Sequence, residues 1–174
     1  MVKPSIRVLV VDDYEPLRHL FVSTLGRQPE LQVIGELSDG LEAVLRAREL
    51  QPDLILLDIG LPTLNGIEAA RRIREQSPES KILFLSENRS WDVVEEALHT
   101  GAGGYVLKSD AGNELLPAVE AVLQGKQFVS SSLSGHQGNQ HGDEHTGEHP
   151  SRKKGPLPSN DGKICRPSRG SVLF

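Results

Sequence analysis

Polar side chains that can bind a cation or a phosphate stand at the ends of apolar runs at four places in this chain: Asp12 with Asp13, Asp58, Ser86, and Lys108. The clearest case is Asp58, which ends the uninterrupted apolar run 54–57 and is followed by Gly60 and Pro62. A carboxylate at the end of a buried run is costly unless a partner compensates its charge. We therefore interpret these side chains as parts of one site.

The chemistry of such a site follows from its carboxylates. Three clustered carboxylates repel each other, and a hard divalent cation relieves that repulsion. Mg²⁺ suits the site because it prefers oxygen ligands in an octahedron and keeps several waters. With the cation bound, Asp58 is a candidate nucleophile that forms an aspartyl phosphate. Lys108 and the Ser86 hydroxyl would then bind the remaining phosphoryl oxygens.

These side chains can meet only if the apolar runs are strands of one sheet. Short apolar runs bounded by turn residues are typical of strands buried on both faces. We predict five of them, over residues 6–11, 31–37, 54–57, 81–85 and 105–107. Helical spacing of the apolar residues that follow each run predicts five helices. This alternation predicts an α/β fold, a doubly wound parallel sheet with helices on both faces and all strand carboxyl ends at one edge.

Two of the predicted helices have local features of their own. Asp39, with Glu42 three residues later, resembles a capping box at the start of the second helix. The apolar spacing after it places Leu41, Val44 and Leu45 on the buried side of that helix. Pro117 falls inside the last helical pattern, so we expect either a kink or a helix that starts late.

The balance of charged side chains differs between the first 130 residues and the rest of the chain. Residues 1–130 carry 13 basic and 20 acidic side chains, whereas residues 131–174 carry six and four. An acidic body does not favour nucleic-acid binding, which needs clustered Lys and Arg.

Cys165 is the only cysteine, so an internal disulfide is excluded and a reducing compartment is expected. No signal-peptide pattern is present, and no apolar stretch approaches the ~20 residues of a membrane-spanning helix, so we expect a cytoplasmic protein without a membrane partner.

The last quarter of the chain differs from the rest. Residues 130–174 are rich in Gly, Ser, Pro, His and Asn, with almost no periodic apolar residues. Such a segment cannot bury enough surface to offset the entropy lost on ordering. We therefore predict one domain over residues 5–129 and a disordered tail over residues 130–174.

The ordered set of site residues, together with the stretches 58–62 and 66–68, resembles the receiver domain of bacterial two-component response regulators. The resemblance covers residues 5–130 and is closest to the subfamily that usually carries a LuxR-type helix-turn-helix. It implies a flavodoxin-like five-stranded sheet with the strand order 2-1-3-4-5. It also implies a phosphoryl donor, either a histidine kinase or a phosphotransfer protein.

The resemblance implies a role for each residue of the acidic cluster. Asp58 accepts the phosphoryl group and contributes to the magnesium site. Asp13 ligates Mg²⁺ directly, and Asp12 acts through a water molecule. Gly60 contributes its backbone carbonyl, and Lys108 pairs with the phosphate.

The resemblance further implies a switch. Ser86 closes onto the phosphate, and Tyr105 turns inward with it. This rearranges the surface formed by the fourth helix, the fifth strand and the fifth helix, through which a homodimer or a partner would bind. Two positions depart from the usual receiver pattern: Ser109 stands where many receivers have proline, and Glu87 brings a charge close to the phosphate site.

Three functions remain open at this point. The first is a phosphorylation-operated switch that is not an enzyme beyond its own phosphorylation and dephosphorylation. The second is a transcription regulator of the LuxR-type subfamily whose helix-turn-helix is truncated or lost, because no pair of amphipathic helices fits residues 135–174 and DNA binding by this chain is not supported. The third is a Mg²⁺-dependent phosphatase, which the lack of a recognisable separate general acid disfavours.

Overall fold

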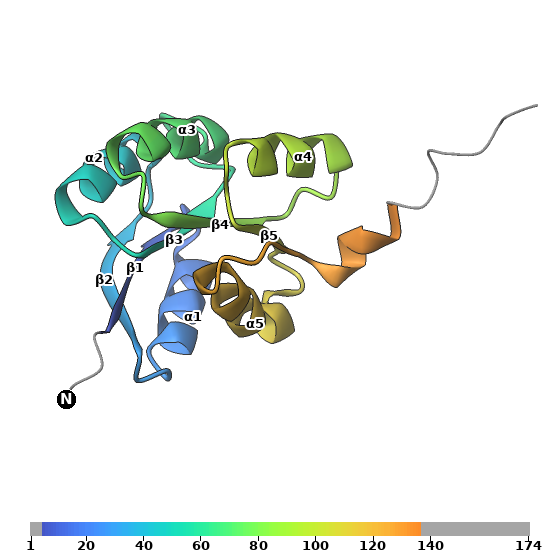
Figure 1. Ribbon diagram of the computed structural model, residues 1–174, viewed down its shortest axis with the longest axis horizontal. Helices are drawn as coiled ribbons and strands as arrows, with labels where there is room; N and C mark the ends of the chain where they lie inside the picture. The colour runs from blue at the N-terminus through green and yellow to red at the C-terminus, as the bar shows by residue number, and fades with distance from the viewer. Residues whose placement is uncertain (1–4, 137–174) are drawn as a thin grey trace, which may run out of the picture. The chain divides into compact units, whose positions relative to one another are not determined.

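A six-stranded parallel sheet lies at the centre of the protein (Figure 1). The structure is a computed structural model that describes residues 5–136. The strands, in chain order, are β1 (Ile6–Val11), β2 (Leu31–Leu37), β3 (Leu54–Asp58), β4 (Lys81–Ser86), β5 (Gly104–Leu107) and β6 (Phe128–Val129). Their order in the sheet is β2-β1-β3-β4-β5-β6. The predicted order of the first five strands is confirmed, and β6 adds a short strand that was not predicted.

Five helices cover the two faces of the sheet: α1 (Glu15–Leu25), α2 (Gly40–Leu50), α3 (Gly66–Gln76), α4 (Trp91–His99) and α5 (Ala111–Leu123). Helices α2, α3 and α4 lie on one face, and α1 and α5 lie on the other (Figure 1). The predicted doubly wound arrangement is therefore confirmed.

Alternate side chains of each central strand enter two separate cores. In β3, Ile55 and Leu57 pack on the side of α2, α3 and α4, whereas Leu54 and Leu56 pack on the side of α1 and α5. Side chains alternate along a strand, so a strand covered on both faces needs apolar residues at every position. This explains why the run 54–57 is uninterrupted until Asp58.

The predicted buried side of α2 is wrong at two of its three positions. Leu41 and Leu45 are 40% and 52% exposed, whereas Val44 is buried as predicted. The smaller residues Ala43 and Ala47 face the core instead. Small side chains on that face allow the helix to lie close to its neighbours, and apolar spacing alone does not distinguish the two arrangements.

Two further predictions concern single helices. The Asp39 carboxylate accepts hydrogen bonds from the backbone N–H groups of Leu41 and Glu42, so the predicted cap of α2 is confirmed. Helix α5 begins at Ala111 and continues through Pro117, so a late start is wrong.

The chain continues beyond β6 in a 3₁₀ helix, Ser131–His136. Ser130 and Leu133 are buried, and Leu133 joins the core that α2, α3 and α4 cover. The rest of the predicted tail, with Cys165, lies outside the described residues. Within residues 5–136, no helix is both long and apolar enough to cross a membrane.

Gly66 allows α3 to begin directly against the end of β3. Its N–H donates to the Ile59 carbonyl at 2.9 Å, and a Cβ at this position would lie 1.9 Å from the Asp58 carbonyl oxygen. We expect Gly66→Ala to lower the free energy of unfolding by about 1–3 kcal/mol, because the helix and the strand end must separate. Urea unfolding measures this change.

Gly112→Ala in α5 is the matched control, because a Cβ there meets no atom within 4 Å. We expect this variant to gain about 0.5–1 kcal/mol, the usual preference for alanine over glycine within a helix. Equal effects of the two substitutions would contradict the close approach that we describe at Gly66.

Candidate functional site

The predicted site residues meet at the carboxyl edge of the sheet. Asp12 and Asp13 follow β1, Asp58 ends β3, Ser86 ends β4, and Lys108 follows β5. One carboxylate oxygen from each of the three aspartates lies within 4.8 Å of the other two. Segments that are far apart in the sequence therefore form a single acidic cluster.

Lys108 lies between two of these carboxylates. Its Nζ atom is 2.8 Å from Asp12 Oδ2 and 2.9 Å from Asp58 Oδ2. The three side chains are only 7%, 1% and 7% exposed, respectively. Burial raises the pKa of Asp12, although Lys108 acts in the opposite direction. Burial also opposes the charge on Lys108, but its close pairing with the two carboxylates holds the pKa of this lysine above its ordinary value.

Backbone groups orient the buried carboxylates. Asp12 Oδ1 accepts a hydrogen bond from the Tyr14 N–H at 3.0 Å, and Asp58 Oδ1 accepts one from the Gly60 N–H at 3.2 Å. Arg18 donates to the backbone carbonyl of Asp12 at 2.7 Å, which connects α1 to the end of β1. Asp13, in contrast, is exposed. The cluster thus combines two fixed, buried carboxylates with one that faces solvent.

The acidic cluster fits a hard divalent cation. All three of its side-chain donors are carboxylate oxygens, the type of ligand that Mg²⁺ and Ca²⁺ prefer. In addition, Asp12 Oδ2 is buried and accepts no hydrogen bond of good geometry from the described residues, although it is paired with Lys108. An oxygen in this situation gains from a further positive partner.

Ser86 and Tyr105 are connected through a residue that was not predicted. The buried Ser86 hydroxyl accepts a hydrogen bond from the Asn88 N–H at 3.1 Å. The Tyr105 hydroxyl donates to the Asn88 carbonyl at 2.8 Å, and its ring is fully buried near Phe84. Burial raises the pKa of the Tyr105 hydroxyl. The only sequence signal for Asn88 is its position two residues after the end of β4.

A cavity of about 400 Å³ opens next to the cluster. Asp58, Ser86 and Lys108 line it, and so do Gly60 and Glu87. The chain thus brings the predicted nucleophile, hydroxyl and lysine to one accessible space. Glu87 adds a further carboxylate to the wall, as its position in the sequence predicted.

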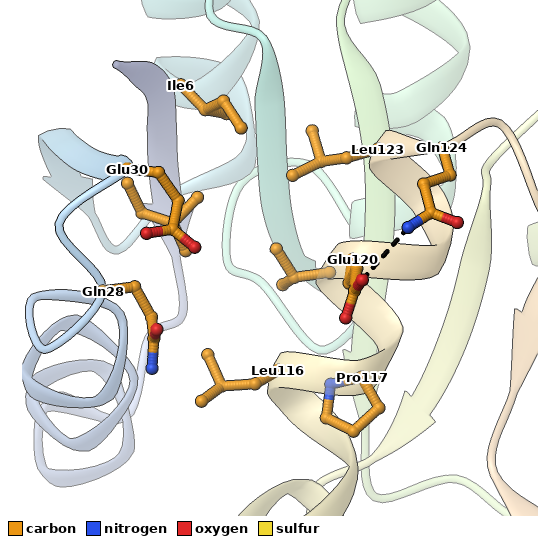
Figure 2. Close-up of a pocket in the computed structure, with 10 residues that line it drawn as sticks. Ile6, Gln28, Glu30, Leu116, Pro117, Glu120, Leu123 and Gln124 are labelled. Carbon is orange, nitrogen blue, oxygen red and sulfur yellow. Dashed lines mark hydrogen bonds between the residues drawn. The ribbon is translucent and has the colours of Figure 1, made fainter. Parts of the chain in front are cut away.

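A larger hollow of about 590 Å³ lies at the opposite edge of the sheet, between the starts of β1 and β2 and helix α5 (Figure 2). Ile6, Leu116 and Leu123 contribute apolar surface to it. Among residues 5–136, the titratable residues that line it are Glu30 and Glu120. Its described lining contains two carboxylates but neither a lysine nor a serine, unlike the smaller cavity, to which we therefore assign the chemistry.

A doubly wound parallel sheet with an acidic cluster and a lysine at its carboxyl edge is the arrangement that a phosphoacceptor signalling domain requires. The family described as "Response regulator receiver domain" matches residues 8–120. The chain belongs to this family. The chain therefore carries the receiver domain of a response regulator, a kind of domain that is not a conventional enzyme, and this disfavours the phosphatase alternative.

The relatives agree with this assignment. The chain is 38% identical over 130 residues to the transcriptional regulatory protein LiaR of Bacillus subtilis, covering 75% of this chain and 62% of the relative. It is 37% identical over 126 residues to the DNA-binding transcriptional activator DevR/DosR of Mycobacterium tuberculosis, covering 72% and 58%. It is also similar to the crystal structure of a LuxR-family two-component response regulator from Aurantimonas, with a TM-score of 0.72, 34% identity, and coverage of 75% and 94%.

The relation to the LuxR-type subfamily is thus confirmed. The chain spans about three fifths of the length of these two curated relatives.

Proposed function

We propose that Asp58 is the phosphoacceptor of a histidine-to-aspartate phosphorelay. The observation that supports this role most strongly is the position of its carboxylate, which lines the accessible cavity and lies 2.9 Å from Lys108 Nζ. The carboxylates of Asp12 and Asp13 lie next to it. Membership of the receiver family implies a cognate histidine kinase as partner, and we propose its phosphohistidine, or that of a phosphotransfer protein, as the donor.

In the proposed step, a carboxylate oxygen of Asp58 attacks the phosphorus atom of the phosphohistidine. An O–P bond forms as the N–P bond breaks, and the electron pair of the broken bond stays on the imidazole nitrogen of the donor protein. Lys108 exchanges its ion pair with Asp58 for one with a phosphoryl oxygen. The Ser86 hydroxyl donates a hydrogen bond to another phosphoryl oxygen.

We propose Mg²⁺ as the cation of the acidic cluster. Asp13 and Asp58 would bind it directly, Asp12 through water, and Gly60 through its backbone carbonyl. When bound, Mg²⁺ supplies charge neutralisation of the phosphoryl oxygens during transfer. The exposed position of Asp13 favours this assignment, because a cation that keeps several waters needs an open side.

We further propose that phosphorylation acts on the surface formed by α4, β5 and α5. When Ser86 turns toward the phosphate, its hydrogen bond from the Asn88 N–H is lost, and Asn88 is also the partner of the Tyr105 hydroxyl. A change at the site is thereby passed to a side chain of β5. We expect this surface to form a homodimer when Asp58 is phosphorylated, and light scattering with and without beryllofluoride tests it. An unchanged mass would contradict dimerisation through phosphorylation.

The proposed function predicts one covalent phosphate per chain. On incubation with a small acyl phosphate and Mg²⁺, we expect the intact mass of the wild type to increase by one phosphoryl group. Asp58→Asn should take up none, because the amide is not a nucleophile of comparable strength, and chelation of Mg²⁺ should slow uptake by the wild type. Asp92→Asn, an exposed carboxylate of α4, is the control and should match the wild type. Equal uptake by Asp58→Asn would contradict the assignment.

A second proposal concerns the output. The names of the relatives LiaR and DevR/DosR describe transcriptional regulation, and we propose that this receiver also serves a transcriptional regulator. Binding to promoter DNA that depends on sequence and weakens with salt would support a direct role. Its absence would favour action through a partner protein.

A further inference from the structure

Ser130 joins strand β5 to the segment that follows helix α5. It is fully buried. Its N–H donates a hydrogen bond to the Tyr105 carbonyl at 2.9 Å, and its hydroxyl oxygen accepts one from the Leu107 N–H, also at 2.9 Å. One of these two partners is the proposed switch residue, and the other directly precedes Lys108.

The local strand pairing explains why a side chain is needed here. Strand β6 pairs with β5 only at Gly104 and Tyr105. The chain then turns into the 3₁₀ helix at Ser131, so no backbone acceptor from β6 reaches the Leu107 N–H. The hydroxyl of Ser130 takes its place. Buried N–H groups need such a partner.

The other side of β5 is held by β4. The Lys108 N–H donates to the Ser86 carbonyl at 2.9 Å. The two successive peptide groups before Lys108 are therefore held from different sides: the Leu107 N–H donates to Ser130, and the Lys108 N–H donates to Ser86. This backbone fixes the point from which the Lys108 side chain extends to Asp58.

Glu114 of α5 supports the Ser130 hydroxyl. Glu114 Oε2 accepts a hydrogen bond from Ser130 Oγ at 2.6 Å, and its Oε1 accepts from both the N–H and the hydroxyl of Ser131. A chain of hydrogen bonds thus runs from the Leu107 N–H through Ser130 to a carboxylate. Hydrogen bonds to an ionised acceptor are stronger than neutral ones, and bonds in a chain strengthen each other.

We propose that Ser130, supported by Glu114, is a positioning residue for Lys108 and ties the segment after β6 to the state of Asp58. This inference rests on the proposed function, because it is the phosphoryl group that moves Lys108. Coupling between two sites is reciprocal. A shift of Lys108 should therefore change the stability of the segment 130–136. Separately, loss of the Ser130 hydroxyl should slow phosphorylation, because the Leu107 N–H loses its partner and the backbone before Lys108 is held less firmly.

Two measurements on the full chain test this inference. Hydrogen exchange follows the effect of Asp58 on the segment 130–136, and phosphorylation kinetics follow the effect of Ser130 on Asp58. In the wild type, we expect the addition of Mg²⁺ and beryllofluoride to change the hydrogen-exchange rate of the Leu133 amide. This amide donates to the Ser130 carbonyl. In Ser130→Ala, this response should disappear, and the rate constant of phosphoryl uptake should fall by roughly five- to tenfold. Glu114→Gln keeps an acceptor oxygen but loses the charge, so it should show the same two changes to a smaller extent.

Ser131→Ala is the matched control, because it removes a hydrogen bond to the same Glu114 carboxylate without touching β5. It should respond like the wild type in both measurements. If Ser130→Ala does not fold, Glu114→Gln decides alone, since its partly exposed side chain is not part of the core. If Glu114→Gln and Ser131→Ala take up the phosphoryl group at equal rates, the positioning role is overturned.

Binding of beryllofluoride distinguishes the positioning role of Ser130 from the phosphoacceptor role of Asp58. Binding of beryllofluoride by the wild type, followed by fluorine-19 NMR, together with an unchanged Leu133 exchange rate would overturn this inference and leave the phosphoacceptor role intact. Failure of the wild type to bind beryllofluoride or to take up phosphate would overturn both.

Discussion

Replacing Lys108 by methionine is expected to lower the free energy of unfolding by about 3–5 kcal/mol in metal-free buffer at neutral pH. The wild-type ammonium group lies within 2.9 Å of both Asp12 and Asp58, and all three side chains are almost fully buried. Methionine preserves most of the volume of the side chain but removes the charge. Two buried carboxylates would then face each other without a cation.

Urea unfolding in the presence of a chelator measures this effect. Lys126→Met is the control, because Lys126 is exposed and forms no ion pair within the described part of the chain; it should change stability by less than about 0.5 kcal/mol. Adding Asp12→Asn to Lys108→Met should restore part of the lost stability, because it removes one of the opposed charges. A loss below about 1 kcal/mol would show that the cluster does not depend on the lysine.

Addition of Mg²⁺ is the second change with a large expected effect. A cation that binds the folded chain alone stabilises it by about 2.7 kcal/mol at one hundred times its dissociation constant. We expect this gain in the wild type, because the cation relieves the repulsion among the three aspartates. Asp13→Asn should lose most of the gain at the same Mg²⁺ concentration, since it removes the exposed ligand.

The same unfolding experiment includes its own control. Asp92→Asn removes an exposed carboxylate from α4, away from the cluster, and should retain the full response to Mg²⁺. Lys108→Met should gain more from Mg²⁺ than the wild type, because the cation replaces the missing charge. Equal gains in the wild type, Asp13→Asn and Lys108→Met would contradict a cation site at these residues.

Most of the fold and the positions of the site residues could be predicted, because their signals are local. An uninterrupted apolar run identifies a strand covered on both faces, and parallel strands must present their carboxyl ends at one edge. Asp12, Asp58 and Lys108 each stand at such an end. Their meeting therefore follows from the strand pattern without knowledge of any single contact.

The features that were missed depend on contacts between distant segments. The exposure of Leu41 and Leu45 follows from how closely α2 approaches its neighbours, which apolar spacing does not determine. Strand β6 has only two residues and no alternating pattern. Asn88 acts mainly through its backbone, and backbone partners leave no signal in residue types.

Ser130 is the clearest example of a residue whose role depends on contacts between distant segments. In the sequence it is the first residue of a segment rich in serine and glycine, and nothing there distinguishes it from its neighbours. Its role becomes visible only when Leu107 and Glu114 are in place around it.

Chemical mapping of the phosphorylated residue shows whether Asp58 accepts the phosphoryl group. Borohydride reduces an aspartyl phosphate to homoserine, so peptide mass spectrometry of the treated, phosphorylated wild type identifies the residue that bore the phosphoryl group. We expect homoserine at position 58 alone, formed only with the phosphoryl donor present and far more slowly without Mg²⁺. Homoserine at position 12 or 13, or no reducible acyl phosphate anywhere in the chain, would contradict the assignment of Asp58.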